Sequence, residues 1–508
     1  MKEGQITRRT FLHATALAGA AMTVGCSSAS VLNTENRLKT SEMKDNKKAF
    51  DKPNIVIITC DQLACDAIGA NGNEYVNTPG IDHIFANGTS FDKTYTPYPL
   101  CTPARASFWT GQLPHQTKIT SNLSTMMHNR TITIGSIFSE VGYDTYHVGK
   151  THDAGSLRGF TVERDNLRIA SNPSPAYPEH FQSEEDRVTI QKAREFLTKE
   201  HDKPFLLAVE FNNPHNINNW IGEFQGKHGD IEGMAGPLPP LRANYKNDDI
   251  QNRPEAIRYA CCLQVRQEQV SEWDDRNYRQ YLNAYYHYTN MADDLVGQVL
   301  LAIEHSDARD NTLVVFMSDH GDGMGSHKLV AKSSNFYDEA ARVPFVLMGK
   351  GIPAGKRINS LTGLCDLLPT LCHYADIEIP KPRTEREVIF GKSMLPLLSS
   401  NKPIHEYMVS QWYTQLNNNF VPSRMFRTED YKYTHYLNDG GEELYDMAND
   451  PGELTNLARK PEYAETLKWI RKEFHHYLET TDDHYFNEKF SFQESYRKHQ
   501  EGFRNHTT

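Results

Sequence analysis

One stretch, Asn54-Ile55-Val56-Ile57-Ile58-Thr59-Cys60-Asp61-Gln62, sets the architecture that we expect for the whole chain. An apolar run without alternation is typical of a strand at the centre of a sheet that is covered on both faces. In open sheets of parallel strands, ligands bind at the carboxyl ends of the strands. Asp61 and Gln62 follow such an end, so the sequence offers two oxygen ligands at the place where a binding site is expected.

Three further apolar runs have the same form, and charged, amide or imidazole side chains follow each of them. These runs and their endings are residues 143–148 with Gly149-Lys150-Thr151-His152, residues 204–211 with Asn212-Asn213-Pro214-His215, and residues 312–317 with Ser318-Asp319-His320-Gly321. Any one ending is also what a solvated loop would show. Four of them on parallel strands would meet at one edge of a sheet. We therefore predict an α/β fold with a large mixed, mostly parallel sheet and helices on both of its faces.

The stretch Leu100-Cys101-Thr102-Pro103-Ala104-Arg105 places one small reactive side chain, that of Cys101, at the expected start of a helix. Pro103 suits the first helical turn, so Cys101 or Thr102 is expected at the N-cap. Free backbone N–H groups and the helix dipole favour an anion there, and Arg105 adds positive charge. A lone cysteine is also commonly a buried core residue. If Cys101 is a nucleophile, its substrate is expected to be an anion.

The chain has 508 residues, of which 38% are hydrophobic, enough for a large core and one smaller domain. Its net charge of −11 and its isoelectric point near 6.1 argue against a nucleic-acid-binding protein, although both are compatible with a local basic pocket for an anion. No Cys-x-x-Cys pair suggests zinc. Cys365 and Cys372 could form a disulfide or stay as buried thiols, and the sequence leaves both open.

The N-terminus resembles a twin-arginine export signal that ends in a lipoprotein cleavage site. Its elements are Thr7-Arg8-Arg9-Thr10-Phe11-Leu12, a weakly apolar run from Ala14 to Val24, and Gly25-Cys26-Ser27. The usual leucine before Cys26 is missing, so an ordinary amphipathic or unstructured N-terminus is the alternative. We expect an export signal over residues 1–26 and a flexible tether over 27–52. The protein would then be an exported, periplasmic or membrane-anchored lipoprotein of a bacterium, held by a lipid on Cys26.

The stretch 216–269 is rich in Asn, Gly and Pro and lacks clear periodicity, so we expect a substrate-facing loop after His215. Most exposed loop residues contact nothing, but three in this stretch are candidates for contact with a sugar: Trp220, His228 and Arg242. Apolar residues at helical spacing predict a helix over 278–305 that packs on the sheet. A shorter helix is expected over 131–140.

Beyond residue 382 the pattern changes, and the sheet domain is expected to end there. Residues alternate between apolar and polar over 423–428, 431–436 and 443–446, with a turn at 438–441. This pattern predicts a small antiparallel sheet with a hairpin. A helix is expected over 461–478. We therefore predict a catalytic domain over residues 53–382 and a smaller C-terminal α/β subdomain over 383–508.

The Cys-x-Pro-x-Arg spelling at Cys101, followed by Ala106-Ser107 and Thr110-Gly111, resembles the signature of the type I sulfatases. In that family, of the alkaline phosphatase superfold, the cysteine is oxidised to formylglycine. Further matches cover nearly the whole chain after the N-terminal segment. They are Asp61-Gln62 and Asp319-His320 with the two metal-ligand pairs, Gly149-Lys150-x-His152 with the Gly-Lys-x-His element, Asn213-Pro214-His215 with the third-strand histidine, and Lys332, upstream of Tyr337 and Arg342-Val343-Pro344, with the second sulfate lysine.

Two positions depart from the family pattern. Gln62 stands where many relatives have an aspartate, and Thr151 precedes His152 where a tryptophan is common. An amide oxygen can still bind a hard cation, so Ca²⁺ is the expected metal, with Mg²⁺ second. Asp322 could support the metal ligands from behind. His115 and His327 are expected to be structural.

The resemblance implies a sulfatase that acts on sulfated carbohydrates. Formylglycine made from Cys101 would hydrate, and one hydroxyl would attack sulfur while the other would be deprotonated later to expel sulfate. The implied roles are cation binding for Asp61, Gln62, Asp319 and His320, sulfate binding for Arg105, Lys150 and Lys332, general acid for His215 and general base for His152. The implied partners are a sulfated saccharide and a sulfatase-maturation enzyme, with no nucleic acid.

Three alternatives stay open at this point. A phosphomonoester or phosphonate hydrolase of the same superfold would use similar ligands, and an aryl or choline sulfatase would act on small substrates. A glycan-binding surface lipoprotein with an inactive site is the third. The presence of Cys101, Lys150, His152 and His215 argues against it.

Overall fold

The computed structural model describes residues 52–124, 126–163, 184–224, 237–246, 253–258, 265–332, 335–381, 388–414, 421–437 and 440–489. All of them belong to one unit, Lys48–Thr508. The expected export signal, the expected tether up to residue 51 and His228 lie outside the described residues. In the part of the chain that is described, no helix combines the length and the apolar character needed to cross a membrane.

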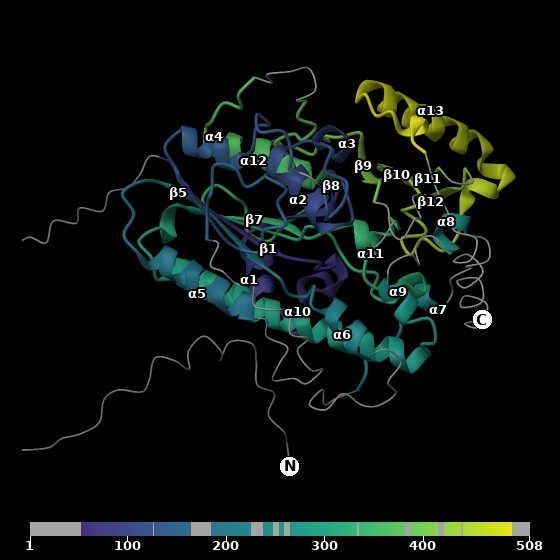
Figure 1. The fold of residues 1–508 in the computed structure, drawn as a ribbon, viewed down its shortest axis with the longest axis horizontal. Coiled ribbons are helices and arrows are strands. Elements are labelled where there is room, and N and C mark those ends of the chain that lie inside the picture. Colours follow the sequence, from purple (N-terminus) through teal and green to yellow (C-terminus); the bar gives the residue numbers. More distant parts are fainter. Residues whose placement is uncertain are drawn as a thin grey trace, which may run out of the picture. The chain divides into compact units, whose positions relative to one another are not determined.

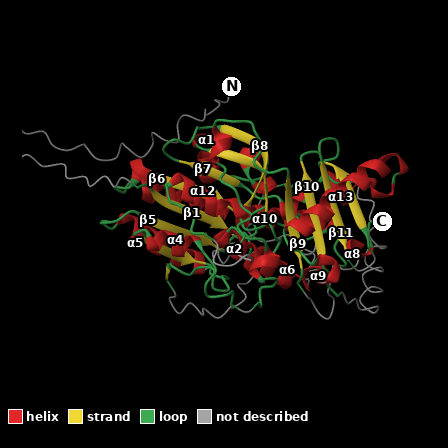
Figure 2. Cartoon of the chain, turned by 90° about the horizontal axis from the view of Figure 1, so that it is seen from above, coloured by secondary structure: helices red, strands yellow, loops and turns green. Residues whose placement is uncertain are grey.

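The apolar run at Asn54 forms β1 (Asn54–Cys60), a strand in which every residue is buried. It pairs in parallel with β5 and β6 inside an eight-stranded sheet of order β4-β3-β5-β1-β6-β7-β2-β8 (Figures 1 and 2). The other strands of this sheet are β2 (Thr89–Tyr95), β3 (Asp144–Gly149), β4 (Thr161–Val162), β5 (Phe205–Phe211), β6 (Thr312–Met317), β7 (Phe345–Met348) and β8 (Lys356–Gly363). Among these described strands, β7 alone runs antiparallel to its neighbours. The predicted mixed, mostly parallel sheet is confirmed.

Alternate residues of the central strands enter two separate cores. Val56 and Ile58 pack with α1 (Pro79–Asn87), α5 (Glu184–Thr198) and α10 (Asp275–Glu304). Ile55 and Ile57 pack on the other face with α2 (Cys101–Thr110), α4 (Ile134–Glu140) and α12 (Leu367–Tyr374). Figure 1 shows these two helix layers on either side of the sheet. Both faces are covered, as the unbroken apolar run at Asn54 predicted.

A second sheet of four antiparallel strands follows in the C-terminal part, in the order β12-β11-β10-β9. Its strands are β9 (Tyr407–Trp412), β10 (Ser423–Thr428), β11 (Tyr431–Tyr436) and β12 (Glu442–Asp446). Phe426 and Tyr433 on this sheet share a core with Ile470 and Phe474 of α13 (Ala464–Thr480). The predicted small antiparallel sheet and its helix are confirmed, whereas the limit between the two domains at residue 382 stays a prediction.

The stretch 216–269 is not the continuous loop that its composition suggested. It contains α6 (Ile217–Phe224), α7 (Ala243–Lys246), α8 (Glu255–Arg258) and α9 (Val265–Gln269). Trp220 is 1% exposed and packs against Trp273 with ring centroids 5.9 Å apart, because Ile217, Trp220 and Ile221 form one apolar face of a short helix. Trp220 is therefore a core residue, and the prediction that it could contact a sugar is wrong.

Contacts in the fold show how Arg242 and the two cysteines of the sequence analysis are held. Arg242 donates a hydrogen bond to Asp66 at 2.6 Å and another to Glu339 at 3.2 Å, so ion pairs hold this candidate for sugar contact. Cys365 and Cys372 are free, buried thiols, which decides between the two states that the sequence left open. The remaining short helices are α3 (Pro114–Thr117) and α11 (Asp338–Ala341).

Candidate active site

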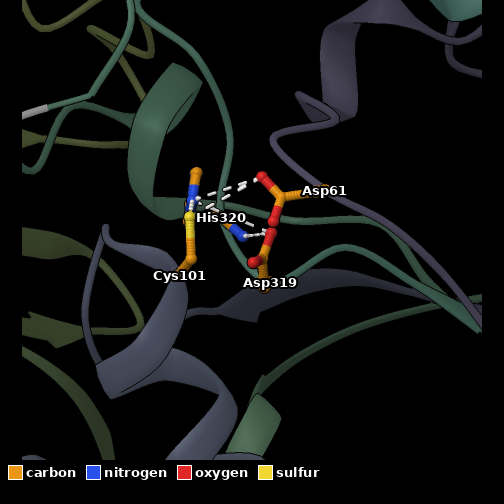
Figure 3. Close-up of side chains that lie close together, drawn as sticks. All are labelled: Asp61, Cys101, Asp319 and His320. Atoms are coloured by element: carbon orange, nitrogen blue, oxygen red, sulfur yellow. Dashed lines mark hydrogen bonds and ion pairs between the residues drawn. The ribbon is translucent and has the colours of Figure 1, made fainter. Parts of the chain in front are cut away.

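The ends of β1 and β6 bring two carboxylates and an imidazole together beside the start of α2 (Figure 3). Asp61 follows β1, and Asp319 and His320 follow β6, because the two strands are parallel neighbours in register. One ligand atom from each of Asp61, Cys101, Asp319 and His320 lies within 4.8 Å of the other three. All four residues have no exposed surface. The sequence-based prediction of a shared edge thus agrees with the geometry.

Cys101 is the first residue of α2, and Leu100 is its N-cap. The expectation of Cys101 or Thr102 at the N-cap is wrong by one residue, because Leu100 supplies the extended backbone that a cap needs. No side chain caps this end by the usual bond, but Asn122 Oδ1 accepts from the backbone N–H of Thr102 at 3.0 Å. The Cys101 thiol lies at the positive end of a ten-residue helix.

Two lysines bring positive charge to the thiol. Lys332 Nζ is 3.3 Å from Cys101 Sγ, and Lys150 Nζ is 2.7 Å from Asp61 Oδ2. Burial and the Asp61 carboxylate act to raise the pKa of Cys101, but Lys332, Lys150 and His320 outweigh them and hold it well below the usual value for a thiol. Although burial also acts to raise the pKa of Asp61, Lys150 and the other cations keep it well below its usual range. The site is therefore built to hold negative charge.

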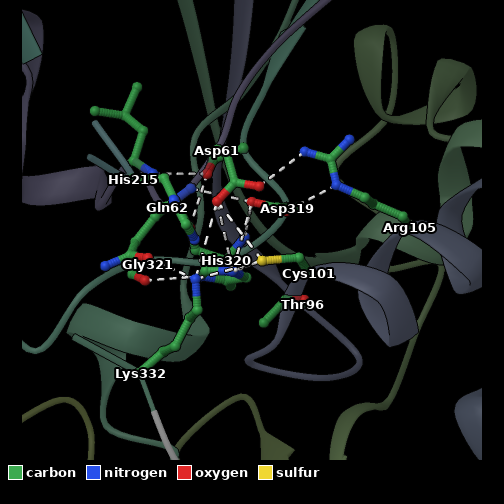
Figure 4. Close-up of polar contacts among 12 residues, drawn as sticks. Asp61, Gln62, Thr96, Cys101, Arg105, His215, Asp319, His320, Gly321 and Lys332 are labelled. Atoms are coloured by element: carbon green, nitrogen blue, oxygen red, sulfur yellow. Dashed lines mark hydrogen bonds and ion pairs between the residues drawn. The ribbon is translucent and has the colours of Figure 1, made fainter. Parts of the chain in front are cut away.

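Gln62 is held at both ends of its amide, and Figure 4 shows it together with Lys332 at the oxygen end. Its Oε1 accepts from Lys332 Nζ at 2.6 Å and from Asn218 Nδ2 at 2.9 Å. Its Nε2 donates to Asp322 Oδ2 at 2.6 Å. The Gln62 backbone has φ 68°, the left-handed region that non-glycine residues rarely adopt. The amide oxygen is thereby turned to the side of Lys332 and the amide nitrogen to the side of Asp322.

Arg105 contacts three carboxylates. Its Nε donates to Asp319 Oδ2 and its Nη2 to Asp61 Oδ2, both at 3.1 Å, and its Nη1 pairs with Glu210. Figure 4 shows Arg105 on one side of Asp61 and Asp319 and Lys332 on the other. This arrangement differs from the expectation that Arg105 meets the sulfate, because each of its terminal nitrogens already faces a carboxylate.

The two predicted acid–base histidines are placed differently. His215 lies among the site residues drawn in Figure 4, and burial together with Lys150 and Lys332 lowers its pKa to about 3. His152 is exposed, its backbone has φ 32°, and no hydrogen bond or ion pair joins it to the described residues of the site. The structure therefore brings His215 into the cluster and leaves His152 outside it.

His115 and His327, which we expected to be structural, contact residues outside the cluster around Cys101. His115 Nδ1 is 2.8 Å from Gln411 Nε2, and His115 Nε2 is 2.9 Å from the carbonyl oxygen of Thr481. His327 packs against Tyr337 with ring centroids 4.0 Å apart and the rings tilted by 30°, and its Nδ1 is 2.8 Å from Arg253 Nη2.

Sequence reasoning missed Glu210 and Asn218. Glu210 is the single charged residue inside the apolar run 204–211, and it is fully buried. A carboxylate in a buried strand needs a partner, and this was the available signal. Asn218 lies on α6, in the stretch that was expected to be a loop, so the sequence carried no clear signal for it.

The donors at this edge fit a hard divalent cation. Asp61 and Asp319 supply carboxylate oxygens, Gln62 an amide oxygen and His320 an imidazole nitrogen. Gln62 Oε1 and Asp61 Oδ1 both face the ammonium group of Lys332, whose Nζ lies 2.6 Å from the first oxygen and 4.0 Å from the second. These donors could thus hold a metal ion beside Cys101.

Comparison with known proteins gives one consistent family. The model of the sulfatase family matches residues 53–377, and a model of the C-terminal part of N-sulphoglucosamine sulphohydrolase matches residues 325–480. The chain is 40% identical over 468 residues to the Delta 4,5-hexuronate-2-O-sulfatase of Bacteroides thetaiotaomicron, covering 90% of this chain and 95% of that protein.

Comparison with solved structures leads to the same family. One described as a 2-O GAG sulfatase has a TM-score of 0.80 and 40% identity, over 88% of this chain and 96% of that one. A phosphonate monoester hydrolase of Agrobacterium radiobacter has a TM-score of 0.68 at 20% identity, over 85% and 96%, which shows a common fold alone. Family model, relative and structure together with the cluster around Cys101 show that the chain belongs to the sulfatase family and is a sulfuric ester hydrolase.

Proposed function

We propose that this enzyme removes sulfate esters from carbohydrates, with 2-O-sulfated unsaturated hexuronates as the preferred substrates. The buried cluster of Cys101, His320 and Lys332 carries the hydrolysis. The choice of sugar is supported by the 40% identity to a Delta 4,5-hexuronate-2-O-sulfatase over nearly the full length of both chains.

Cys101 is the proposed precursor of formylglycine, whose hydrated aldehyde supplies a hydroxyl nucleophile for attack on sulfur. Asp61, Gln62, Asp319 and His320 would hold Ca²⁺, with Mg²⁺ as second choice, and such an ion supplies positive charge next to the reacting oxygens. A sulfatase-maturation enzyme is therefore a proposed partner. Chelation is expected to abolish turnover, and added Ca²⁺ to restore it.

Lys150 and Lys332 are the proposed sulfate ligands of the chain itself. Their ammonium groups lie against Asp61 and Cys101, and the start of α2 adds oriented backbone N–H groups. Positive charge that is fixed before the substrate arrives stabilises the charge that develops on the sulfate oxygens. Arg105 takes a different role in this proposal, because it holds Asp61 and Asp319 in place.

His215 is the proposed general acid, since it lies beside Cys101, where the leaving oxygen would be. Lys150 and Lys332 contribute to its low pKa, and a bound sulfate would offset their charge and raise that pKa. For the base we propose His152, whose exposed ring would have to turn toward Cys101 from the loop that follows Lys150.

Export to the periplasm or to a membrane surface is also proposed, on the twin-arginine and lipoprotein-type pattern of residues 7–27. The lipid anchor would be attached at Cys26. Fractionation of a cell that expresses the full chain, compared with a Cys26→Ala variant, tests this. Wild-type protein that stays in the cytoplasm would contradict it.

The substrate proposal is tested by measuring sulfate release from a matched panel. The panel holds a 2-O-sulfated unsaturated uronate disaccharide, a 6-O-sulfated glucosamine, nitrophenyl sulfate, choline sulfate and nitrophenyl phosphonate. We expect the highest kcat/KM on the 2-O-sulfated uronate and none with Cys101→Ala. A preference for choline sulfate, nitrophenyl sulfate or the phosphonate would contradict the proposed substrate.

A further inference from the structure

Glu210 is a fully buried carboxylate directly behind the proposed cation site. It lies on β5, where its backbone is opposite Thr59 of β1 on one side and Gly149 of β3 on the other. Its carbonyl oxygen accepts from the N–H of Lys150 at 3.0 Å. A Cβ on Gly149 would lie 2.1 Å from that oxygen, so only glycine permits this approach. The position of Glu210 is thus set by the centre of the sheet.

The Glu210 side chain pairs with Arg105, which divides the oxygens of the two site aspartates into two sets. The Oδ2 atoms of Asp61 and Asp319 accept from Arg105. The Oδ1 atoms face the other way. Asp61 Oδ1 is 3.7 Å from Cys101 Sγ, and Asp319 Oδ1 accepts from the backbone N–H groups of Gln62 and His320 at 3.1 and 3.0 Å.

The charge of Glu210 matters as much as its position. Arg105 places a full positive charge against the carboxylates that would bind a divalent cation, and cations repel each other strongly in a site with no exposed surface. Glu210 compensates this charge from the far side of the guanidinium. Without Glu210, the charge of Arg105 would oppose binding of a metal ion, although the contacts of Arg105 hold the two aspartates in place for it.

We propose that Glu210 is a positioning residue that, through Arg105, orients Asp61 and Asp319 and raises the affinity of the site for a divalent cation. His147 belongs to the same buried group, since its Nε2 lies 3.7 Å from Glu210 Oε2. The inference rests on the proposed cation site of the sulfatase, and it concerns cation binding rather than turnover.

Cation binding to the chelator-treated full chain, measured by titration calorimetry with Ca²⁺ and separately with Mg²⁺, tests the inference. Glu210→Gln keeps the shape and removes the charge, and its affinity is expected to fall by about 10-fold, the low end of the effect of losing an outer partner of a metal ligand, because Glu210 acts on the ligands through Arg105. Glu210→Asp keeps the charge on a shorter side chain, and its affinity is expected to lie between wild type and Glu210→Gln.

Asp483→Asn is the matched control. Asp483 is also buried and pairs with an arginine, Arg424 of β10, at 2.7 and 2.9 Å, but it lies in the loop after α13, in the C-terminal part of the chain. This variant is expected to lower the thermal midpoint and leave cation affinity unchanged. Wild-type affinity in Glu210→Gln, or an equal loss in Asp483→Asn, would overturn the inference. If Glu210→Gln does not fold, wild-type affinity in Glu210→Asp would overturn it.

Sulfate release is measured on the same preparations to separate this inference from the proposed function. A wild type that binds cations with the expected order of variants but releases no sulfate would contradict the proposed function and support this inference. A wild type that binds neither cation would overturn the inference, whatever its turnover.

Discussion

The amide nitrogen of Gln62 donates to Oδ2 of Asp322 at 2.6 Å, and this bond determines which way the amide faces. An ionised carboxylate accepts hydrogen bonds and donates none, so it selects the nitrogen and leaves Oε1 for the cluster. The carboxylate that orients this amide is that of Asp322, which lies behind Gln62 as seen from Lys332.

Asp322→Asn is expected to weaken cation binding by about 10- to 100-fold. Asp322 Oδ1 accepts from the N–H of Met324 at 2.8 Å, and Oδ2 accepts from Gln62. An asparagine amide would set its own nitrogen against one of these two donors in either orientation. Calorimetry with Ca²⁺ checks this. Tyr281→Phe, which removes a donor to Asp322 and an acceptor for the Ala331 N–H but leaves the bond between Asp322 and Gln62, is the control and is expected to lose less affinity; the reverse order would contradict the role of Asp322.

His215→Ala is expected to lower turnover of a sulfated sugar by about 10²- to 10⁴-fold, the usual contribution of a general acid. The loss on nitrophenyl sulfate is expected to be far smaller, because nitrophenolate leaves without a proton. Rates of both variants, His215→Ala and His152→Ala, are compared on both substrates at one pH. If His152 is the base, its variant is slow on both substrates. Equal losses of His215→Ala on the two would show that it binds substrate instead.

The pH dependence of stability gives a second test of His215. Burial and the two lysines lower its pKa to about 3 in the folded chain, against about 6.5 in the unfolded chain. The unfolded state therefore binds the extra proton between these values, so the stability from neutral His215 is present above pH 6.5 and is lost as the pH falls toward 3. From pH 7 to 5, the loss is about 1–2 kcal/mol.

The measurement is the thermal midpoint of wild type and His215→Gln at pH 7 and pH 5, in the presence of a chelator. The wild type is expected to lose more stability than the variant over this range. The same loss in both proteins would mean that His215 titrates normally in the fold.

Trp220→Ala tests the correction to the sequence-based loop. Because Trp220 is buried against Trp273, truncation is expected to cost about 3–5 kcal/mol of stability. Trp220→Phe is the control that keeps most of the packing. KM for the preferred sugar is expected to stay near the wild-type value in Trp220→Phe. A large rise in KM without loss of stability would show instead that Trp220 contacts the substrate.

The strands that carry the site could be predicted because they are long and fully buried. After their first residues, the runs that form β1, β5 and β6 are apolar except for Thr59 and Glu210, and such unbroken apolar runs predict buried strands. The strands β2 and β8 could not be predicted in this way. β8, with the sequence KRINSLTG, is a half-exposed edge strand whose pairing depends on its neighbour β2 rather than on its own pattern.

Within the site, it was easier to predict which residues take part than which way their side chains point. Asp61, Asp319 and His320 meet because the ends of parallel strands meet. Arg105 and His152 were assigned by motif, but the direction of a side chain depends on its surroundings. Arg105 turns to Glu210, a residue distant in sequence, and His152 follows a glycine with φ 96° at 149 in a turn that leaves it exposed.

The extent to which Cys101 is converted to the aldehyde, set against turnover, tests the central claim most directly. Mass spectrometry of the Cys101 peptide gives the converted fraction in preparations made with different amounts of maturation enzyme, and sulfate release from the 2-O-sulfated uronate gives the rate. The account predicts a rate proportional to the converted fraction, and no rate in Cys101→Ala. Full turnover by protein whose Cys101 is entirely an unmodified thiol would contradict it.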